Sequence, residues 1–273
     1  MKLQAEGLSY SYGRKLAVDN LSFSVEDGEF VGLIGPNGSG KSTALKMIYR
    51  ALRPQAGRIL LDGQDLLKMP YRQSAQMLAA VSQENEIPFS FTVEEIAAMG
   101  RSPHKRFFEA DALEDKRIVA QALAQLGLTD LAQRSYDQIS GGEKQRTVIA
   151  RALAQQCPFL VLDEPANHLD IGFQMQIFSL VKGLGCSALA AVHDLNMAAL
   201  YCDRIYILKN GKLVCCGSPE QTLTPETIWE IYGVRSVVSR QPETGKLSIA
   251  FLPKEAEQAI GTVFNSHLQK RRF

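Results

Sequence analysis

The chain has 273 residues, of which 45% are hydrophobic and 22% are charged, and its formal net charge is +1. This length and composition suit a globular protein with a sizeable core, and the near-neutral charge excludes a general attraction to nucleic acid or to anionic surfaces. The sequence contains no apolar run of about 18 residues and no secretory pattern, so we expect neither a membrane span nor a signal peptide. None of the five cysteines forms a CxxC pair, so we expect reduced structural thiols.

Short apolar runs alternate with segments of helical periodicity, which is typical of an α/β fold. The stretch "QAGRILLDGQDL" at 55–66 predicts a hairpin, because Asp62 and Gly63 suit the positive φ angles of a type I′ turn. We expect strands at Phe30–Ile34, Arg58–Leu61, Ala79–Val81, Phe159–Leu162, Ala188–Val192 and Arg204–Leu208.

The first expected strand leads into "GPNGSGKST", which matches the phosphate-binding P-loop pattern GxxxxGK[ST]. Glycines let backbone N–H groups approach a triphosphate, and the helix predicted after the loop directs its N-terminal dipole at the phosphates. We expect Lys41 to contact the β- and γ-phosphates, Ser42 to bind Mg²⁺ and Thr43 to donate to the α-phosphate. The predicted ATP-binding loop consists of Gly35, Pro36, Asn37, Gly38, Ser39, Gly40, Lys41, Ser42 and Thr43.

The region from about Thr92 to Gln156 contains charged helical stretches and no clear strand. We interpret it as a helical insertion into the α/β core, and its charge run at Glu109–Arg117 as a solvated helix face.

Inside this region, "ISGGEKQR" at 139–146 places a serine and two glycines at the start of a helix. Ser140, Gly141 and Gly142 therefore offer a second helix N-terminus with a bare backbone and a hydroxyl, which again suits a phosphate. The P-loop already accounts for one triphosphate, so this second end needs a further explanation.

An apolar strand ends in two carboxylates in "FLVLDEP" at 159–165. At the carboxyl edge of the strand, the turn lets both side chains approach a bound nucleotide. We expect Asp163 to hold Mg²⁺ through water and Glu164 to act as the general base on the attacking water.

Together, "GPNGSGKST", "ISGGEKQR" and "FLVLDEP" resemble the ATP-binding-cassette (ABC) ATPases, with Ile139 in place of the usual leucine. The resemblance implies a P-loop NTPase with a RecA-like α/β core, an antiparallel β subdomain and an inserted α-helical subdomain. It implies an ATPase domain at 1–235, with a core at about 1–88 and 158–235, a helical subdomain at about 89–157, and an appendage at 236–273. It also implies that the loop of Ser140 reaches the γ-phosphate bound to the other subunit of a head-to-tail dimer.

Four further residues take roles from the resemblance. Tyr12 matches the aromatic residue that stacks on adenine, with Tyr10 as the alternative. Gln83 matches the glutamine that contacts Mg²⁺ and the attacking water. Asp170, in "ANHLD", matches the segment at the subunit contact, and His193, in "AAVHDLN", matches the histidine that contacts the γ-phosphate.

The stretch "TVEEIAAMGRSPH" at 92–104 and the tail from about 230 are similar to the ATPases of uptake systems for ferric siderophores, haem and vitamin B12. This similarity implies a homodimer at the cytoplasmic face of the inner membrane, docked on separate permease subunits and served indirectly by a substrate-binding protein. The implied docking surface is a groove near Gln83 and residues 84–100. The alternatives are an efflux ATPase and a soluble ABC ATPase acting on nucleic acid or ribosomes; we expect no direct nucleic-acid contact.

Overall fold

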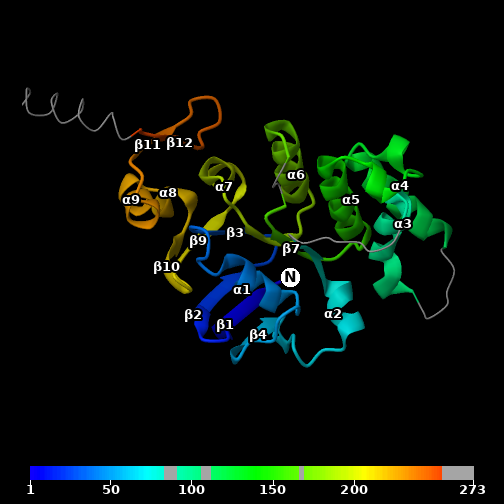
Figure 1. The fold of residues 1–273 in the computed structure, drawn as a ribbon, viewed down its shortest axis with the longest axis horizontal. Helices are drawn as coiled ribbons and strands as arrows, with labels where there is room; N and C mark the ends of the chain where they lie inside the picture. Colours follow the sequence, from blue (N-terminus) through cyan, green and yellow to red (C-terminus); the bar gives the residue numbers. More distant parts are fainter. Residues whose placement is uncertain (83–90, 106–111, 166–168, 254–273) are drawn as a thin grey trace, which may run out of the picture.

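The computed structural model describes residues 1–82, 91–105, 112–165 and 169–253, whose strands form two large sheets and a two-stranded hairpin (Figure 1). The larger sheet has the order β10-β9-β3-β8-β7-β6, and its strands from β9 to β6 are parallel. Its strands are β3 (Phe30–Ile34), β6 (Leu78–Val81), β7 (Phe159–Asp163), β8 (Ser187–Ala191), β9 (Arg204–Lys209) and the antiparallel edge strand β10 (Lys212–Gly217). The predicted α/β class and all six predicted strands are confirmed, with ends shifted by at most two residues.

The parallel strands read as continuous apolar runs because both of their faces are covered. In β7, Phe159 and Val161 belong to the core beneath the four-stranded sheet, whereas Leu160 and Leu162 belong to the core beneath the helices. This double burial fixes the carboxyl edge of the sheet, where the predicted site residues lie.

The four-stranded sheet is antiparallel and has the order β2-β1-β4-β5. Its strands are β1 (Leu3–Tyr12), β2 (Lys15–Val25), β4 (Ala56–Leu61) and β5 (Gln64–Asp65). The turn between β4 and β5 has φ angles of 47° at Asp62 and 78° at Gly63, so the predicted hairpin is confirmed. Helix α1 (Lys41–Ile48) buries Leu45 and Ile48 in the core that this sheet shares with the larger one.

The inserted region is helical in its described part and lies to one side of the sheets (Figure 1). Its helices are α3 (Val93–Ala98), a 3₁₀ helix at Met99–His104, α4 (Leu113–Gln125), 3₁₀ turns at Thr129–Leu131 and Tyr136–Gln138, and α5 (Gly141–Ala154). Residues 109–111 of the predicted solvated charge run lie outside the described residues. The prediction was wrong at Asp115, whose side chain is 14% exposed and accepts a 2.8 Å hydrogen bond from Arg101. Glu114 and Arg117 are exposed as expected.

The remaining helices cover the face of the larger sheet opposite the four-stranded sheet. They are α6 (Ile171–Gly183), α7 (Leu195–Tyr201), α8 (Pro219–Thr222) and α9 (Pro225–Tyr232), while α2 (Tyr71–Met77) precedes β6. The chain then forms the hairpin β11 (Ser236–Arg240) and β12 (Leu247–Phe251), which packs beside α7 (Figure 1). No helix in the described ranges is long and apolar enough to cross a membrane.

Candidate nucleotide-binding and hydrolysis site

The loop after β3 has the backbone shape that the glycines predicted. Gly35, Gly38 and Gly40 have φ angles of 147°, 76° and 103°. A Cβ atom at Gly40 would lie 2.5 Å from the carbonyl oxygen of Ala17, whereas a Cβ atom at Gly38 would meet no described atom within 4 Å. The loop is therefore held tightly from behind and stays open in front, which is the shape of a phosphate cradle.

The cation of the loop is Lys41, at the first position of α1. Its Nζ atom donates to the carbonyl oxygens of Gly35 at 2.7 Å and Pro36 at 3.2 Å, and its side chain is 5% exposed. Burial lowers the pKa of Lys41, against the opposing effect of the Glu164 and Asp163 carboxylates. These interactions fix the ammonium group over the loop, where a triphosphate needs a positive charge.

A cleft of about 260 Å³ opens in front of this loop. Its wall contains the aromatic ring of Tyr12, which is 48% exposed, while Tyr10 is partly buried against the core and does not line the cleft. Lys15 and Ala17 of β2 line the cleft too, and the sequence analysis missed both because they lie outside the loop motif. The lining consists of Tyr12, Lys15, Ala17, Asn37, Gly38, Ser39, Gly40, Lys41, Ser42, Thr43 and Glu164.

Ser42, which lines the cleft, meets the buried side chain of Asp163 behind it. The Ser42 hydroxyl donates to Asp163 Oδ1 at 2.9 Å, and among the described residues the buried Oδ2 atom has no hydrogen-bond partner. Burial raises the pKa of Asp163, and the Ser42 hydrogen bond opposes that effect. A buried carboxylate oxygen beside a hydroxyl is the donor set that Mg²⁺ prefers, so these two residues fit the expected ion.

Glu164 leaves β7 with a φ angle of 53°, which is uncommon for a residue with a side chain. Its side chain is 9% exposed and pairs with His193 Nε2. Because β7 and β8 are neighbouring parallel strands, with Asp163 opposite Ala191, both residues emerge at the same edge of the sheet. Sequence reasoning placed each of them at a strand end but did not pair them.

The second predicted phosphate-binding end lies elsewhere. Ser140 is the N-cap of α5, and its hydroxyl and backbone N–H both donate to Glu143 at 2.7 Å. Ser140, Gly141 and Gly142 do not line the cleft of Lys41. A hydrogen bond from Gln145 to the carbonyl oxygen of Pro165, 3.0 Å long, joins this helix to the end of the Asp163–Glu164 segment.

One other predicted residue, Asp170, stands apart from the cleft. Asp170 caps α6, where its Oδ1 atom accepts a 3.0 Å hydrogen bond from the Phe173 N–H, and its side chain is exposed. Gln83 and the first part, 84–90, of the predicted docking surface at 84–100 lie outside the described residues.

The sequence analysis also missed two supports behind the phosphate loop. Tyr232, at the end of α9, lies beside the Gly35 backbone: burial raises the pKa of its hydroxyl to about 12, and the Gly35 backbone opposes that effect. The N–H of Gly211 donates to the carbonyl oxygen of Ser39 at 3.0 Å. Both come from parts of the chain far from the loop in sequence, so no local pattern could reveal them.

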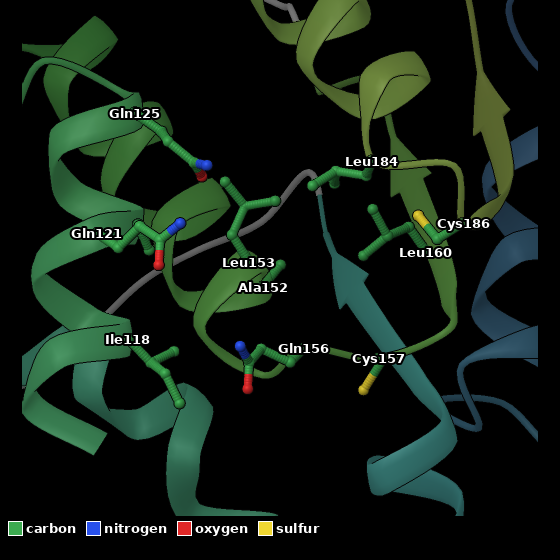
Figure 2. A pocket seen from close by; sticks show the side chains of 11 residues that line it. Ile118, Gln121, Gln125, Ala152, Leu153, Gln156, Cys157, Leu160, Leu184 and Cys186 are labelled. Atoms are coloured by element: carbon green, nitrogen blue, oxygen red, sulfur yellow. The ribbon is translucent and has the colours of Figure 1, made fainter. Parts of the chain in front are cut away.

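A second cavity of about 260 Å³ lies between α4, α5 and the start of β7, as Figure 2 shows. Its walls are apolar side chains, glutamines and the thiols of Cys157 and Cys186, with no cationic group among the lining residues. Burial raises the pKa of Cys157 to about 12, so its thiol is protonated at neutral pH. Without a cation this cavity does not suit a triphosphate, so the cleft at Lys41 is the candidate nucleotide site.

Comparison with known proteins agrees with this assignment of the motifs to one family. Residues 18–167 match the ABC transporter family. The ferric enterobactin transport ATP-binding protein of Escherichia coli is 37% identical over 248 residues, which cover 89% of this chain and 92% of the relative. The hemin import ATP-binding protein of Pseudomonas aeruginosa is 41% identical over 251 residues, which cover 89% and 97%.

Another relative is longer than this chain. The cobalamin import ATP-binding protein of Halobacterium salinarum is 36% identical over 266 residues, but the alignment covers 96% of this chain and only 66% of that protein.

Solved structures agree with the sequence relatives. A metal-chelate type ABC transporter in an inward-facing conformation matches with a TM-score of 0.79 and 28% identity, covering 93% of this chain and 98% of that one. A dimeric bacterial ABC transporter cassette matches with a TM-score of 0.71 and 27% identity, covering 80% and 98%. The predicted P-loop NTPase fold is thus confirmed.

Proposed function

This chain belongs to the ABC transporter family, and from that premise we propose that it is the ATP-hydrolysing subunit of an importer for a metal chelate. The observation that carries the ATPase is the cleft that brings the phosphate loop, Lys41 and Glu164 together, with the buried Asp163 hydrogen-bonded to Ser42 behind it. These are the groups that binding and hydrolysis of a triphosphate require.

In the proposed reaction, the loop N–H groups and Lys41 hold the phosphates, and Tyr12 stacks on the adenine ring. Glu164 accepts the proton of the attacking water, and His193, paired with Glu164, contacts the γ-phosphate. Ser42, Asp163 and Gln83 would hold Mg²⁺, which supplies charge neutralisation at the β- and γ-phosphates when bound. The protein thus acts mainly by positioning and by fixed charge.

Two copies complete the site in this proposal. Ser140, Gly141 and Gly142 form a polar helix end that does not line the cleft of their own chain, so in a head-to-tail dimer they would cover the γ-phosphate of the partner. Asp170 lies at the start of α6, which follows the Asp163–Glu164 segment, and would contact the second copy. A solved dimeric cassette with the same fold supports the arrangement.

The transport role rests on the relatives. The proteins with 36–41% identity cited above are named as ATP-binding proteins for ferric enterobactin, hemin and cobalamin, all metal chelates. We therefore propose membrane permease subunits as partners at the cytoplasmic face of the membrane, docked at the groove near Gln83 and residues 84–100, and a substrate-binding protein as an indirect partner.

Co-purification tests the transport role. A tagged chain expressed in its own cell should bring down a many-helix membrane protein. In vesicles in which this chain faces the lumen, the pair should take up a ferric siderophore, haem or cobalamin only when ATP is inside. Recovery of ribosomes or nucleic acid without a membrane protein would contradict it.

The stacking role of Tyr12 gives a graded prediction. Stacking needs the ring face and not the hydroxyl, so Tyr12→Phe should bind MgATP normally and Tyr12→Ala should bind it more weakly, by about 1 kcal/mol. Tyr10→Ala is the matched control, because Tyr10 contacts the Tyr12 ring edge-on at 5.0 Å but does not line the cleft. Equilibrium titration with a fluorescent ATP analogue measures all three. Weaker binding by Tyr10→Ala alone would show that the stacking residue is Tyr10.

The support behind the phosphate loop gives a second prediction. Gly40→Ala places a Cβ atom 2.5 Å from the Ala17 carbonyl, so the loop must shift and MgATP affinity should fall at least about tenfold. Gly63→Ala is the matched control: its φ is also positive, its Cβ would meet no described atom within 4 Å, and it lies in the β4–β5 turn. Gly63→Ala should lower thermal stability and leave MgATP affinity unchanged. Equal affinities for the two variants would contradict a loop held from behind.

A further inference from the structure

We infer that Asn196 is a positioning residue through which the C-terminal hairpin β11–β12 holds the segment that carries His193 against Glu164. This inference rests on the proposed function, because it gives the hairpin a role in ATP hydrolysis. The observation behind it is a two-way contact between one side-chain amide of α7 and the backbone of one residue of β12.

The contact joins both polar atoms of the Asn196 side chain to the backbone N–H and carbonyl oxygen of Ile249. Asn196 Nδ2 donates to the carbonyl oxygen of Ile249 at 3.2 Å, and the N–H of Ile249 donates to Asn196 Oδ1 at 2.8 Å. Ile249 pairs with Val238 across the hairpin, and its polar groups point to α7 instead of the neighbouring strand. The amide thus takes the place of a further strand at the edge of the hairpin.

His193 lies on a short segment that is fixed at both ends. On the sheet side, the N–H of Val192 donates to the carbonyl oxygen of Leu33 at 3.0 Å. On the helix side, Asp194 Oδ1 accepts hydrogen bonds from the N–H groups of Asn196 at 2.7 Å and Met197 at 3.1 Å. The His193 side chain is itself 37% exposed, so its direction depends mainly on these backbone anchors.

The helix side needs support from outside α7. The helix has only seven residues, and an isolated helix of that length is not stable in water. A two-stranded hairpin is marginal alone as well. Leu247 and Ile249 of β12 are 8% and 5% exposed and belong to the core that contains Leu195 and Met197. Each element therefore supports the other, and the Asn196 contact sets their register.

The base of the hairpin also contacts α9. The N–H of Leu252 donates to the carbonyl oxygen of Arg235 at 2.9 Å, which closes the base of the hairpin, and the Arg235 guanidinium lies over the Trp229 ring of α9, 5.8 Å from its centre. The hairpin can thus transmit the position of α9 to α7. Loss of the Asn196 contact should let the first turn of α7 move, and a small displacement of a group at the reacting centre can lower turnover about a hundredfold.

The test compares Asn196→Ala and Asn196→Asp with Tyr201→Phe in the full chain. Asn196→Asp keeps the size of the side chain but places an oxygen against the Ile249 carbonyl. Tyr201→Phe removes hydroxyl contacts to Ser179 and Met175 at the opposite end of α7, so it is a control for loosening this helix. Both Asn196 variants should lower kcat for ATP hydrolysis about ten- to a hundredfold with KM unchanged, and Tyr201→Phe should match the wild type.

A double variant links the effect to the hairpin. Ile249→Pro removes the backbone N–H that donates a hydrogen bond to Asn196 Oδ1. If both variants break the same contact, the turnover of Asn196→Ala/Ile249→Pro should be no lower than that of the worse single variant. Additive losses would contradict a shared contact. Unchanged kcat in both Asn196 variants, or an equal loss in Tyr201→Phe, would overturn the inference.

Hydrogen–deuterium exchange separates this inference from the proposed function, because it needs no nucleotide. Asn196→Ala should raise exchange at the amides of His193–Met197 and of Ile249, and Tyr201→Phe should not. If the wild type hydrolyses no ATP, the proposed function fails, but the exchange result still shows whether Asn196 holds the segment of His193 in place. Unchanged exchange at His193–Met197 in Asn196→Ala would refute the positioning role.

Discussion

Glu164→Gln is expected to lower ATP turnover by about 10²–10⁴-fold while MgATP still binds, because the amide keeps the shape of the carboxylate and cannot accept the proton of the attacking water. The geometry favours this role over that of a solvated strand end. The Glu164 side chain is 9% exposed, lines the cleft of the phosphate loop and pairs with His193. Its φ angle of 53° shows that the backbone is held in an uncommon conformation.

The control is Glu114→Gln. Glu114 also pairs with a basic side chain, that of Arg117, but it is exposed and does not line the cleft, so its variant should keep the wild-type turnover. Single-turnover hydrolysis and equilibrium MgATP binding should be measured separately for both variants. Turnover near the wild-type rate in Glu164→Gln would assign the base to another residue, and loss of binding in that variant would make Glu164 a binding residue.

The sequence predicted the sheet core well because strands buried on both faces leave an unbroken apolar run. The same logic located Asp163, Glu164 and His193, since polar residues directly after such a run emerge at the carboxyl edge of a parallel sheet. The ends of the runs were less certain: β8 ends at Ala191, one residue before the predicted end. Apolar character alone does not mark where the last ladder hydrogen bond falls.

The alternation of side chains along a strand could not show which of Tyr10 and Tyr12 reaches the cleft. The two residues have the same parity on β1, so a regular strand would place both on one face. Register shifts in the pairing with β2 around Tyr10 and Ser11 remove this equivalence, and only Tyr12 reaches the cleft. Such irregularities depend on the partner strand and leave no local signature.

Contacts between segments far apart in the chain could not be predicted from the sequence for the same reason. The ion pair of Arg101 with Asp115 and the two-way contact of Asn196 with Ile249 each require the tertiary fold before the partners meet. A charged residue within a charged run looks solvated, and an asparagine at the start of a helix looks like a local cap. Side-chain partners of this kind are specified by packing and not by periodicity.

The central claim is that each nucleotide site is shared between two chains, and a mixed dimer isolates it. Glu164→Gln serves as background in both chains, so that bound ATP is not consumed. One chain then carries Lys41→Ala, which removes the cation of its phosphate loop, and the other carries Ser140→Arg, which blocks the helix end of α5. Two different tags allow the mixed dimer to be purified.

In a shared arrangement, the intact phosphate loop of the Ser140→Arg chain meets the intact Ser140 end of the Lys41→Ala chain. One site is then whole and the other is broken twice. If each site is built within one chain, both sites are broken once and none is whole. The number of occluded ATP molecules per dimer distinguishes these cases. The measurement also requires no knowledge of the transported molecule or of the membrane partner.

The measurement is the amount of labelled ATP that remains bound to each purified, Mg²⁺-loaded dimer after gel filtration. The shared site predicts one ATP in the mixed dimer, two in the dimer that carries Glu164→Gln alone, and little or none in either parent homodimer. A folded and stably paired mixed dimer without occluded ATP would contradict the shared site, and with it the proposal that this chain works as a dimeric motor.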